Sequence, residues 1–202
     1  MEFFETVRRR QSVRRFSDQQ VPHEDILAML EAAALAPSAT NEQPWHFTVV
    51  RDRELKTSMR DVVNAVLEAG ISDTDDQSRR RRLTRMRSYS LHFADAPVAI
   101  AVLARPWRGG ANSSHIDSTS RDLAMQSVSM AVAQLMLAAT ALGWSSCFAS
   151  APAEFAHDEL EALLGAKPPW FLLGIISLGK AAKQPRKRAP RKALEEVYTF
   201  IG

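Results

Sequence analysis

Cysteine is nearly absent from this chain of 202 residues, in which Cys147 is the one thiol. A single cysteine cannot form an internal disulfide, so the fold gains nothing from an oxidising compartment, and a cysteine-rich metal site is excluded. Neither an HExxH nor a CxxC motif occurs, and the histidines are spread without the spacing of metal ligands. We therefore expect no metal site and no catalytic triad, and we expect Cys147 to be an inert, small apolar residue.

Long apolar runs are also missing. None approaches the roughly 20 residues that a membrane-spanning helix needs, and the opening MEFFETVRRRQ lacks the apolar segment of a secretory signal. The composition, 46% hydrophobic and 24% charged, is typical of a globular protein. We expect a single domain over residues 1–202, located in the cytoplasm and without a membrane partner.

Strands and helices are both predicted along the whole chain. Runs rich in β-branched and aromatic residues predict strands at 45–50, 98–104, 145–151 and 171–178. Helical spacing of apolar residues predicts helices from His23 to before Pro37, from Leu55 to Gly70, over 123–142 and over 153–165. The acidic and then basic stretch 71–82 has no apolar period and is predicted to be an exposed, mobile loop. This mixture favours a three-layer α+β domain.

The predicted helix over 123–142 carries apolar residues on nearly every face. Such a helix must be buried, either in the core of its own chain or in a core shared with a second subunit. A helix of 20 residues spans about 30 Å. We favour the shared core and expect a dimer.

A basic segment lies near the start of the chain, RRRQSVRRF at Arg8–Phe16. In an extended chain Arg10, Ser12 and Arg14 project to one face, with Arg10 and Arg14 about 13 Å apart. That separation is comparable with the distance from the phosphate to the ring of a flavin mononucleotide. Guanidinium groups match a phosphate at one end and favour a reduced, negatively charged flavin at the other. A solvated basic edge is the other interpretation, and composition alone leaves both open.

The second segment of interest is APSATNEQPW at 36–45. Pro37 ends the preceding helix, and the small or polar side chains after it allow backbone groups to approach a flat ligand closely. The residues concerned are Ser38, Ala39, Asn41 and Gln43. A plain helix-to-strand turn explains the same segment equally well.

Together the two segments resemble the opening of the nitroreductase-like flavoproteins, in which an R-x-S-x-R/K strand precedes an APS-x-x-N-x-QPW segment. The resemblance continues through ADAPVAIAVLA at 94–104, ATALGWSSC at 139–147 and a basic stretch before LEEV at 194–197. It implies an intertwined homodimer with a central mixed, mostly antiparallel sheet flanked by helices. Two FMN molecules are expected at the subunit interface, each contacted by both chains.

The resemblance also implies which residues bind the flavin. One subunit supplies Arg10, Gln11, Ser12 and Arg14, and the other supplies Pro37, Ser38, Ala39 and Asn41, with Gln43 beyond them. Arg191 and Arg188 resemble the basic residues that complete the phosphate site. Ser150 lies where the family brings backbone to the ring, although relatives commonly have glycine or an acidic residue there.

The activity implied is a ping-pong cycle in which NADH or NADPH reduces FMN and leaves, and a small organic acceptor such as a nitroaromatic or a quinone is then reduced. No side chain need act as nucleophile or proton donor.

Two alternative functions stay open. The same fold could carry another flavin reaction, a dehydrogenation or the reduction of another cofactor, set by the loops around 71–90 and 106–118. Less favoured is nucleic-acid binding by the arginines of 79–87, since acidic residues precede them and few aromatics stand nearby.

Overall fold

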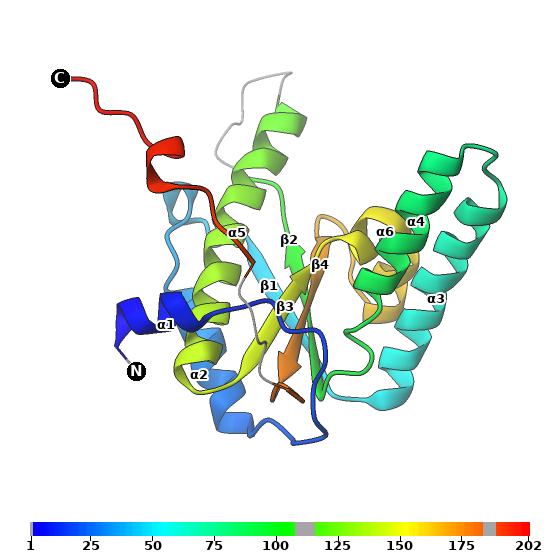
Figure 1. Ribbon diagram of the computed structural model, residues 1–202, viewed down its shortest axis with the longest axis horizontal. Coiled ribbons are helices and arrows are strands. Elements are labelled where there is room, and N and C mark those ends of the chain that lie inside the picture. Colours follow the sequence, from blue (N-terminus) through cyan, green and yellow to red (C-terminus); the bar gives the residue numbers. More distant parts are fainter. Residues whose placement is uncertain (1, 108–115, 184–188) are drawn as a thin grey trace.

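The computed structural model of the protein describes residues 2–107, 116–183 and 189–202 (Figure 1). Its sheet contains four strands in the order β1-β2-β4-β3, and all three pairings are antiparallel. The strands are β1 (Trp45–Val50), β2 (Val98–Ala104), β3 (Ser145–Ala149) and β4 (Phe171–Gly179). Every predicted strand is confirmed, except that the third ends two residues before Ala151.

Helices cover both faces of this sheet, so that the three-layer α+β prediction is confirmed (Figure 1). Beside one face lie α2 (His23–Ala34) and α5 (Ile116–Ala141), and beside the other lie α3 (Arg53–Ser72), α4 (Gln77–Ser90) and α6 (Ala151–Leu164). A short helix, α1 (Phe3–Arg9), precedes them, and the 3-10 turns η1 (Ala39–Asn41) and η2 (Leu194–Glu196) complete the elements.

Strand β2 separates two hydrophobic cores because its side chains alternate between the faces. Val98, Ile100 and Val102 join the core formed with α2 and α5, whereas Ala99, Ala101 and Leu103 join the core formed with α3 and α6. All seven residues of β2 are buried. Its apolar run therefore predicted a central strand correctly.

Helix α5 is unusually long and apolar. Over Thr119–Ala141 it reaches the length and composition of a membrane span, with a mean hydropathy of 1.4, so the expectation that no segment is long enough was wrong. In the structure this segment packs against α2 and the sheet. Met125 and Met130 of this helix are nevertheless 38% and 40% exposed. One chain therefore buries only part of α5.

The predicted loop over 71–82 is the clearest error. Helix α3 continues through Gly70 to Ser72, and α4 begins at Gln77, where the side chain of Asp76 accepts a hydrogen bond from the Ser78 amide. Leu83 and Ser90 are buried residues of α4, so the helix has almost no apolar stripe to read. Ion pairs join α4 to its neighbouring helices, from Arg82 to Glu154 of α6 and from Arg87 to Glu68 of α3.

The basic N-terminal segment is only partly extended. Arg8 and Arg9 belong to α1, and Arg9 pairs with Glu5 one helical turn away. From Arg10 onward the chain leaves the helix, and Ser12 forms a parallel bridge with Ser146 of β3. This bridge is the one parallel element beside the antiparallel strands of the described chain.

Candidate functional site

Backbone hydrogen bonds hold the segment after α1 against the edge of the sheet. The Val13 amide donates to the Ser146 carbonyl at 3.0 Å, and the Ser17 amide donates to the Lys180 carbonyl at 2.8 Å. The Ala182 amide donates back to the Arg15 carbonyl at 3.0 Å. Residues 12–17 therefore run past β3 to the end of β4, and the side chains of Ser12 and Arg14 remain exposed.

A cavity of about 220 Å³ lies beside this segment. Arg14 lines it, together with the end of α4 and the turn that joins β3 to α6. The guanidinium of Arg14 lies 5.3 Å from the centre of the Tyr89 ring, a cation–π contact. Ser150 lines the same cavity and is exposed. Two residues predicted from distant parts of the sequence, Arg14 and Ser150, are thus brought together.

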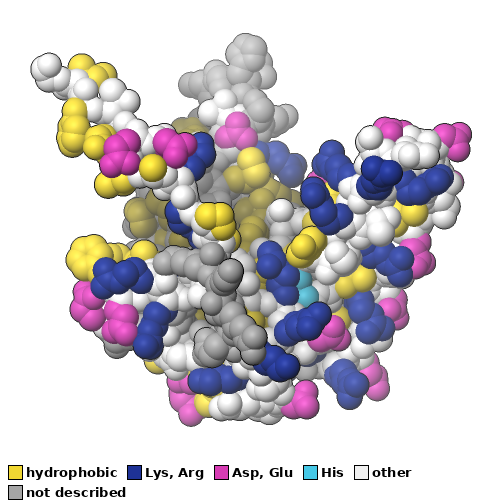
Figure 2. All heavy atoms as spheres, viewed as in Figure 1, with side chains coloured by type: hydrophobic (Ala, Val, Ile, Leu, Met, Phe, Trp, Pro, Cys, Tyr) yellow, Lys and Arg dark blue, Asp and Glu magenta, His cyan; other side chains and the backbone are white. Residues whose placement is uncertain are grey.

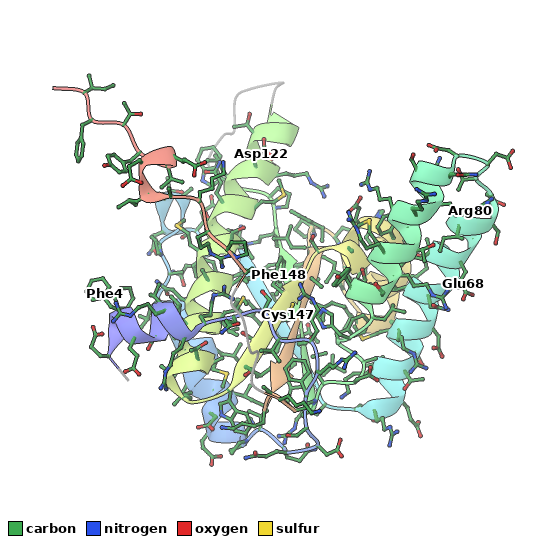
Figure 3. All side chains as sticks on the ribbon, in the orientation of Figure 1. Phe4, Glu68, Arg80, Asp122, Cys147 and Phe148 are labelled. Carbon is green, nitrogen blue, oxygen red and sulfur yellow. The ribbon has the colours of Figure 1, made fainter. Side chains whose placement is uncertain are left out.

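Cys147 marks the floor of the cavity, at the centre of the molecule next to Phe148 (Figure 3). Burial raises the pKa of its thiol, while the charge of Arg14, a hydrogen bond with the Ser12 side chain and the charge of Arg10 act in the opposite direction. Of these residues, Arg14 lines the same cavity as Cys147. The thiol itself stays protonated, as expected for an inert residue.

His92 is a residue of this site that the sequence did not reveal. It lies in the turn after α4, is 7% exposed, and its Nδ1 is 2.7 Å from the Ser177 hydroxyl of β4. Nε2 is buried without a hydrogen-bond partner. Burial, and then the charge of Arg14, lower the pKa of His92 to about 4, so the ring is neutral near pH 7. No motif in the sequence around residue 92 indicates that His92 lies at this site.

Gly174 allows the turn after β3 to approach β4 closely. A Cβ atom at this position would lie 2.5 Å from the Ala149 carbonyl oxygen and 2.7 Å from Cζ of Phe148. Both distances are shorter than real contacts, so any side chain would displace β3. Because Phe148 and Ala149 line the cavity, this glycine sets the position of one of its walls.

The second predicted segment forms a strained turn at η1. Thr40, Asn41 and Gln43 have positive φ angles of 50°, 56° and 49°, and such a conformation is unusual for a β-branched residue such as Thr40. The Ser38 hydroxyl accepts from the Gln43 amide at 2.9 Å, and the indole of Trp107 donates to the Thr40 hydroxyl, also at 2.9 Å.

This turn rests on α5 and not on the Arg14 cavity. The Ala39 amide donates to the Ser127 hydroxyl of α5 at 3.3 Å. Among the described residues, neither Ser12 nor Arg14 shares a hydrogen bond, ion pair or cavity with the segment 38–43. Pro37, Asn41 and Gln43 are exposed. The two predicted halves of the site are therefore not joined within one chain.

Of the two tail arginines predicted to bind the phosphate, the structure describes one. Arg191 is exposed, and among the described residues its guanidinium donates to the neighbouring carbonyls of Ala189 and Pro190 at 3.4 and 3.5 Å. Arg188 lies outside the described residues. Beyond it the tail exposes large apolar side chains, with Phe200 and Ile201 89% and 98% exposed. Nothing among the described contacts brings Arg191 to the cavity.

Comparison with known proteins places this arrangement among flavoproteins. The family model described as the Nitroreductase family matches residues 7–180. A protein of Archaeoglobus fulgidus, provisionally named an NADH dehydrogenase/NAD(P)H nitroreductase, is 33% identical over 171 residues, which cover 84% of this chain and 80% of the relative.

Two solved structures extend the similarity to the whole chain. A BluB-like flavoprotein from Clostridium difficile is 32% identical, with a TM-score of 0.86 and complete coverage of both chains. A nitroreductase with bound FMN from Bacteroides fragilis is 25% identical, with a TM-score of 0.76 and the same coverage.

Proposed function

The chain belongs to the nitroreductase family, and from that membership we propose that it is an FMN-dependent oxidoreductase that takes electrons from NADH or NADPH and passes them to a small organic acceptor. Nitroaromatics, quinones and related compounds are the proposed acceptors. The observation that carries the proposal is the cavity in which Arg14 meets the turn from β3 into α6, since these are two of the elements expected to hold the flavin ring.

The residues present fit a flavin mononucleotide. Arg14 has an exposed guanidinium, and no carboxylate lines the cavity with it. The N-terminus of α6 begins at Ala151, so its free amides add positive partial charge to the same wall. Arg10 and Ser12 lie toward α1 along the same segment and would hold the phosphate end.

When bound, FMN supplies the chemistry of the reaction by accepting a hydride equivalent and passing it on. The chain contributes binding, orientation and electrostatics. A fixed cation such as Arg14 stabilises the negative charge that builds on a reduced flavin. The neutral thiol of Cys147 and the apolar ring of Phe148 exclude water from the floor of the cavity.

We further propose that the site is completed by a second copy of the chain in an intertwined homodimer. The turn at Ser38–Gln43 exposes Thr40, Asn41 and Gln43 and lies apart from Arg14, as expected if it meets the flavin of the partner. Apolar side chains are left uncovered at both ends of the chain, including Phe4 on α1, which points outward in Figure 3, and Phe200 in the tail. Met125 and Met130 of α5 add to this surface. The tail also carries Arg191 and Arg188, which we propose for the phosphate.

The test is to purify the protein, record its visible spectrum, reconstitute it with FMN and titrate it anaerobically with NADH and NADPH. We expect a yellow protein that one or both nicotinamides bleach. Light scattering should give twice the mass of one chain. A colourless protein that takes up no FMN would refute the proposal, and a monomer that binds FMN fully would refute the dimeric site alone.

A further inference from the structure

One wall of the Arg14 cavity has no part in the proposed flavin site. It is formed by Arg85, Met86 and Tyr89 of α4. Arg85 and Tyr89 are four residues apart, so they lie on the same face of the helix. The same cavity holds Arg14 and the turn Ala149–Ala151. The α4 wall therefore faces the place where an acceptor would meet the flavin.

The charged side chains that line the cavity are both positive. Arg14 and Arg85 line it, and no aspartate or glutamate does. His92 adds no charge near pH 7, because burial and the nearby Arg14 lower its pKa to about 4. Cys147 adds none either, because burial raises the pKa of its thiol. Two guanidinium groups thus face a cavity without a counter-charge, which favours an anion.

Arg85 differs from Arg80, Arg82 and Arg87 of α4 in its contacts. Arg80 donates to the carbonyls of Ile71 and Thr74, at the end of α3 and just after it. Arg82 pairs with Glu154, and Arg87 pairs with Glu68 at 2.8 Å. Within the described part of the chain the guanidinium of Arg85 has no hydrogen bond or ion pair; its carbonyl accepts from the Ser88 hydroxyl at 2.7 Å, and the residue is exposed. Figure 2 shows Lys and Arg side chains gathered over α4, so anions are attracted toward this side of the molecule.

The remaining lining is apolar and aromatic. Met86, Tyr89 and Phe148 supply walls suited to a ring, and thioether and aromatic contacts both favour one. Among anionic substituents, a carboxylate matches the planar fork of a guanidinium best.

We propose that the acceptor is a nitroaromatic or quinone whose ring carries a carboxylate, and that Arg85 binds this carboxylate while Met86 and Tyr89 hold the ring. This inference rests on the proposed flavin function and concerns the same cavity. It assigns Arg85 the selection of substrate and leaves the flavin to Arg14.

The experiment compares 4-nitrobenzoate with 4-nitrobenzamide, which have similar size and shape and differ in charge, as acceptors for the FMN-loaded enzyme. We expect a higher kcat/KM for the benzoate. In Arg85→Gln the ratio of the two values should fall about tenfold, the loss that follows removal of a charge-assisted contact. Arg81→Gln is the matched control, since Arg81 is an exposed arginine of α4 that does not line the cavity. It should leave the ratio unchanged.

A second measurement does not depend on turnover. Benzoate is not reduced, so its dissociation constant can be measured with the oxidised holoenzyme from the perturbation of the flavin spectrum. It should rise about tenfold in Arg85→Gln and stay constant in Arg81→Gln. Equal ratios in wild type and Arg85→Gln, or equal effects of the two substitutions, would overturn the assignment of Arg85 while leaving the flavin function intact. Failure to bind FMN would overturn the proposed function and the acceptor site with it.

Discussion

The buried imidazole of His92 should make the stability of the protein depend on pH. Burial first, and the charge of Arg14 second, lower its pKa from 6.5 to about 4, and Asp95 only partly opposes them. In the unfolded chain the same ring titrates near its ordinary value of about 6.5. Between these two values the unfolded state binds more protons than the folded state, so acid favours unfolding.

The magnitude follows from the two pKa values. The contribution of His92 is fully present above pH 6.5 and is lost as the pH falls toward 4. Each pH unit in this interval costs about 1.4 kcal/mol, or about 3 kcal/mol over the whole of it. A domain is typically stable by about 5–15 kcal/mol, so the loss is a large share of the total.

The assay is urea unfolding of the wild type and His92→Gln at about pH 7, 6 and 5, followed by tryptophan fluorescence. Glutamine does not titrate, so the stability advantage of the wild type over this variant should shrink by about 1.4 kcal/mol between pH 6 and 5. His157→Gln is the control because His157 is exposed, and it should keep the pH dependence of the wild type. An advantage of constant size at all three pH values would refute the argument.

Three further predictions concern the cavity and the turn. Gly174→Ala should destabilise the protein by about 1–3 kcal/mol in urea unfolding, because the new methyl group collides with Phe148; an unchanged midpoint would contradict this. Arg14→Ala should lower the flavin's reduction potential or its occupancy, measured by anaerobic redox titration, and an unaltered potential at full occupancy would rule out its assigned role. Trp107→Phe removes the hydrogen bond to Thr40 and should weaken FMN binding while changing the free energy of unfolding by only about 1 kcal/mol; equal FMN affinity in variant and wild type would show that the turn needs no such support.

The sequence predicted those elements whose burial is visible in the order of their own apolar residues. β2 is buried on both faces, so its run of apolar residues identified a central strand. Helix α4 was not predicted because it has almost no apolar stripe, and the acidic partners of its arginines, Glu68 and Glu154, lie elsewhere in the chain. From the sequence alone, a stretch with four adjacent arginines predicts a solvated loop, because the positions of its acidic partners are not visible there.

The candidate site divides in the same way. Arg14 and Ser150 were predicted from motifs near residues 8–16 and from the turn after β3, and the structure brings both to one cavity. His92 and Arg85 enter the same cavity only because α4 packs beside the sheet, and neither has a motif around it. Residues that the fold brings together from separate elements have no characteristic spacing in the sequence, so no sequence motif can predict them.

The basic segment has a structural task besides the binding proposed for it. Strand β3 lies at the edge of the sheet, and its outer side at Ser146 is paired through the bridge from Ser12 and the amide of Val13. That pairing requires an extended backbone, and an extended backbone is what projects Ser12 and Arg14 to the same side. Covering the strand edge and presenting the arginine to the cavity are consequences of one conformation. The alternation in Arg10, Ser12 and Arg14 therefore follows from sheet geometry, whereas the residue types at those positions are what the proposed binding of an anionic ligand would require.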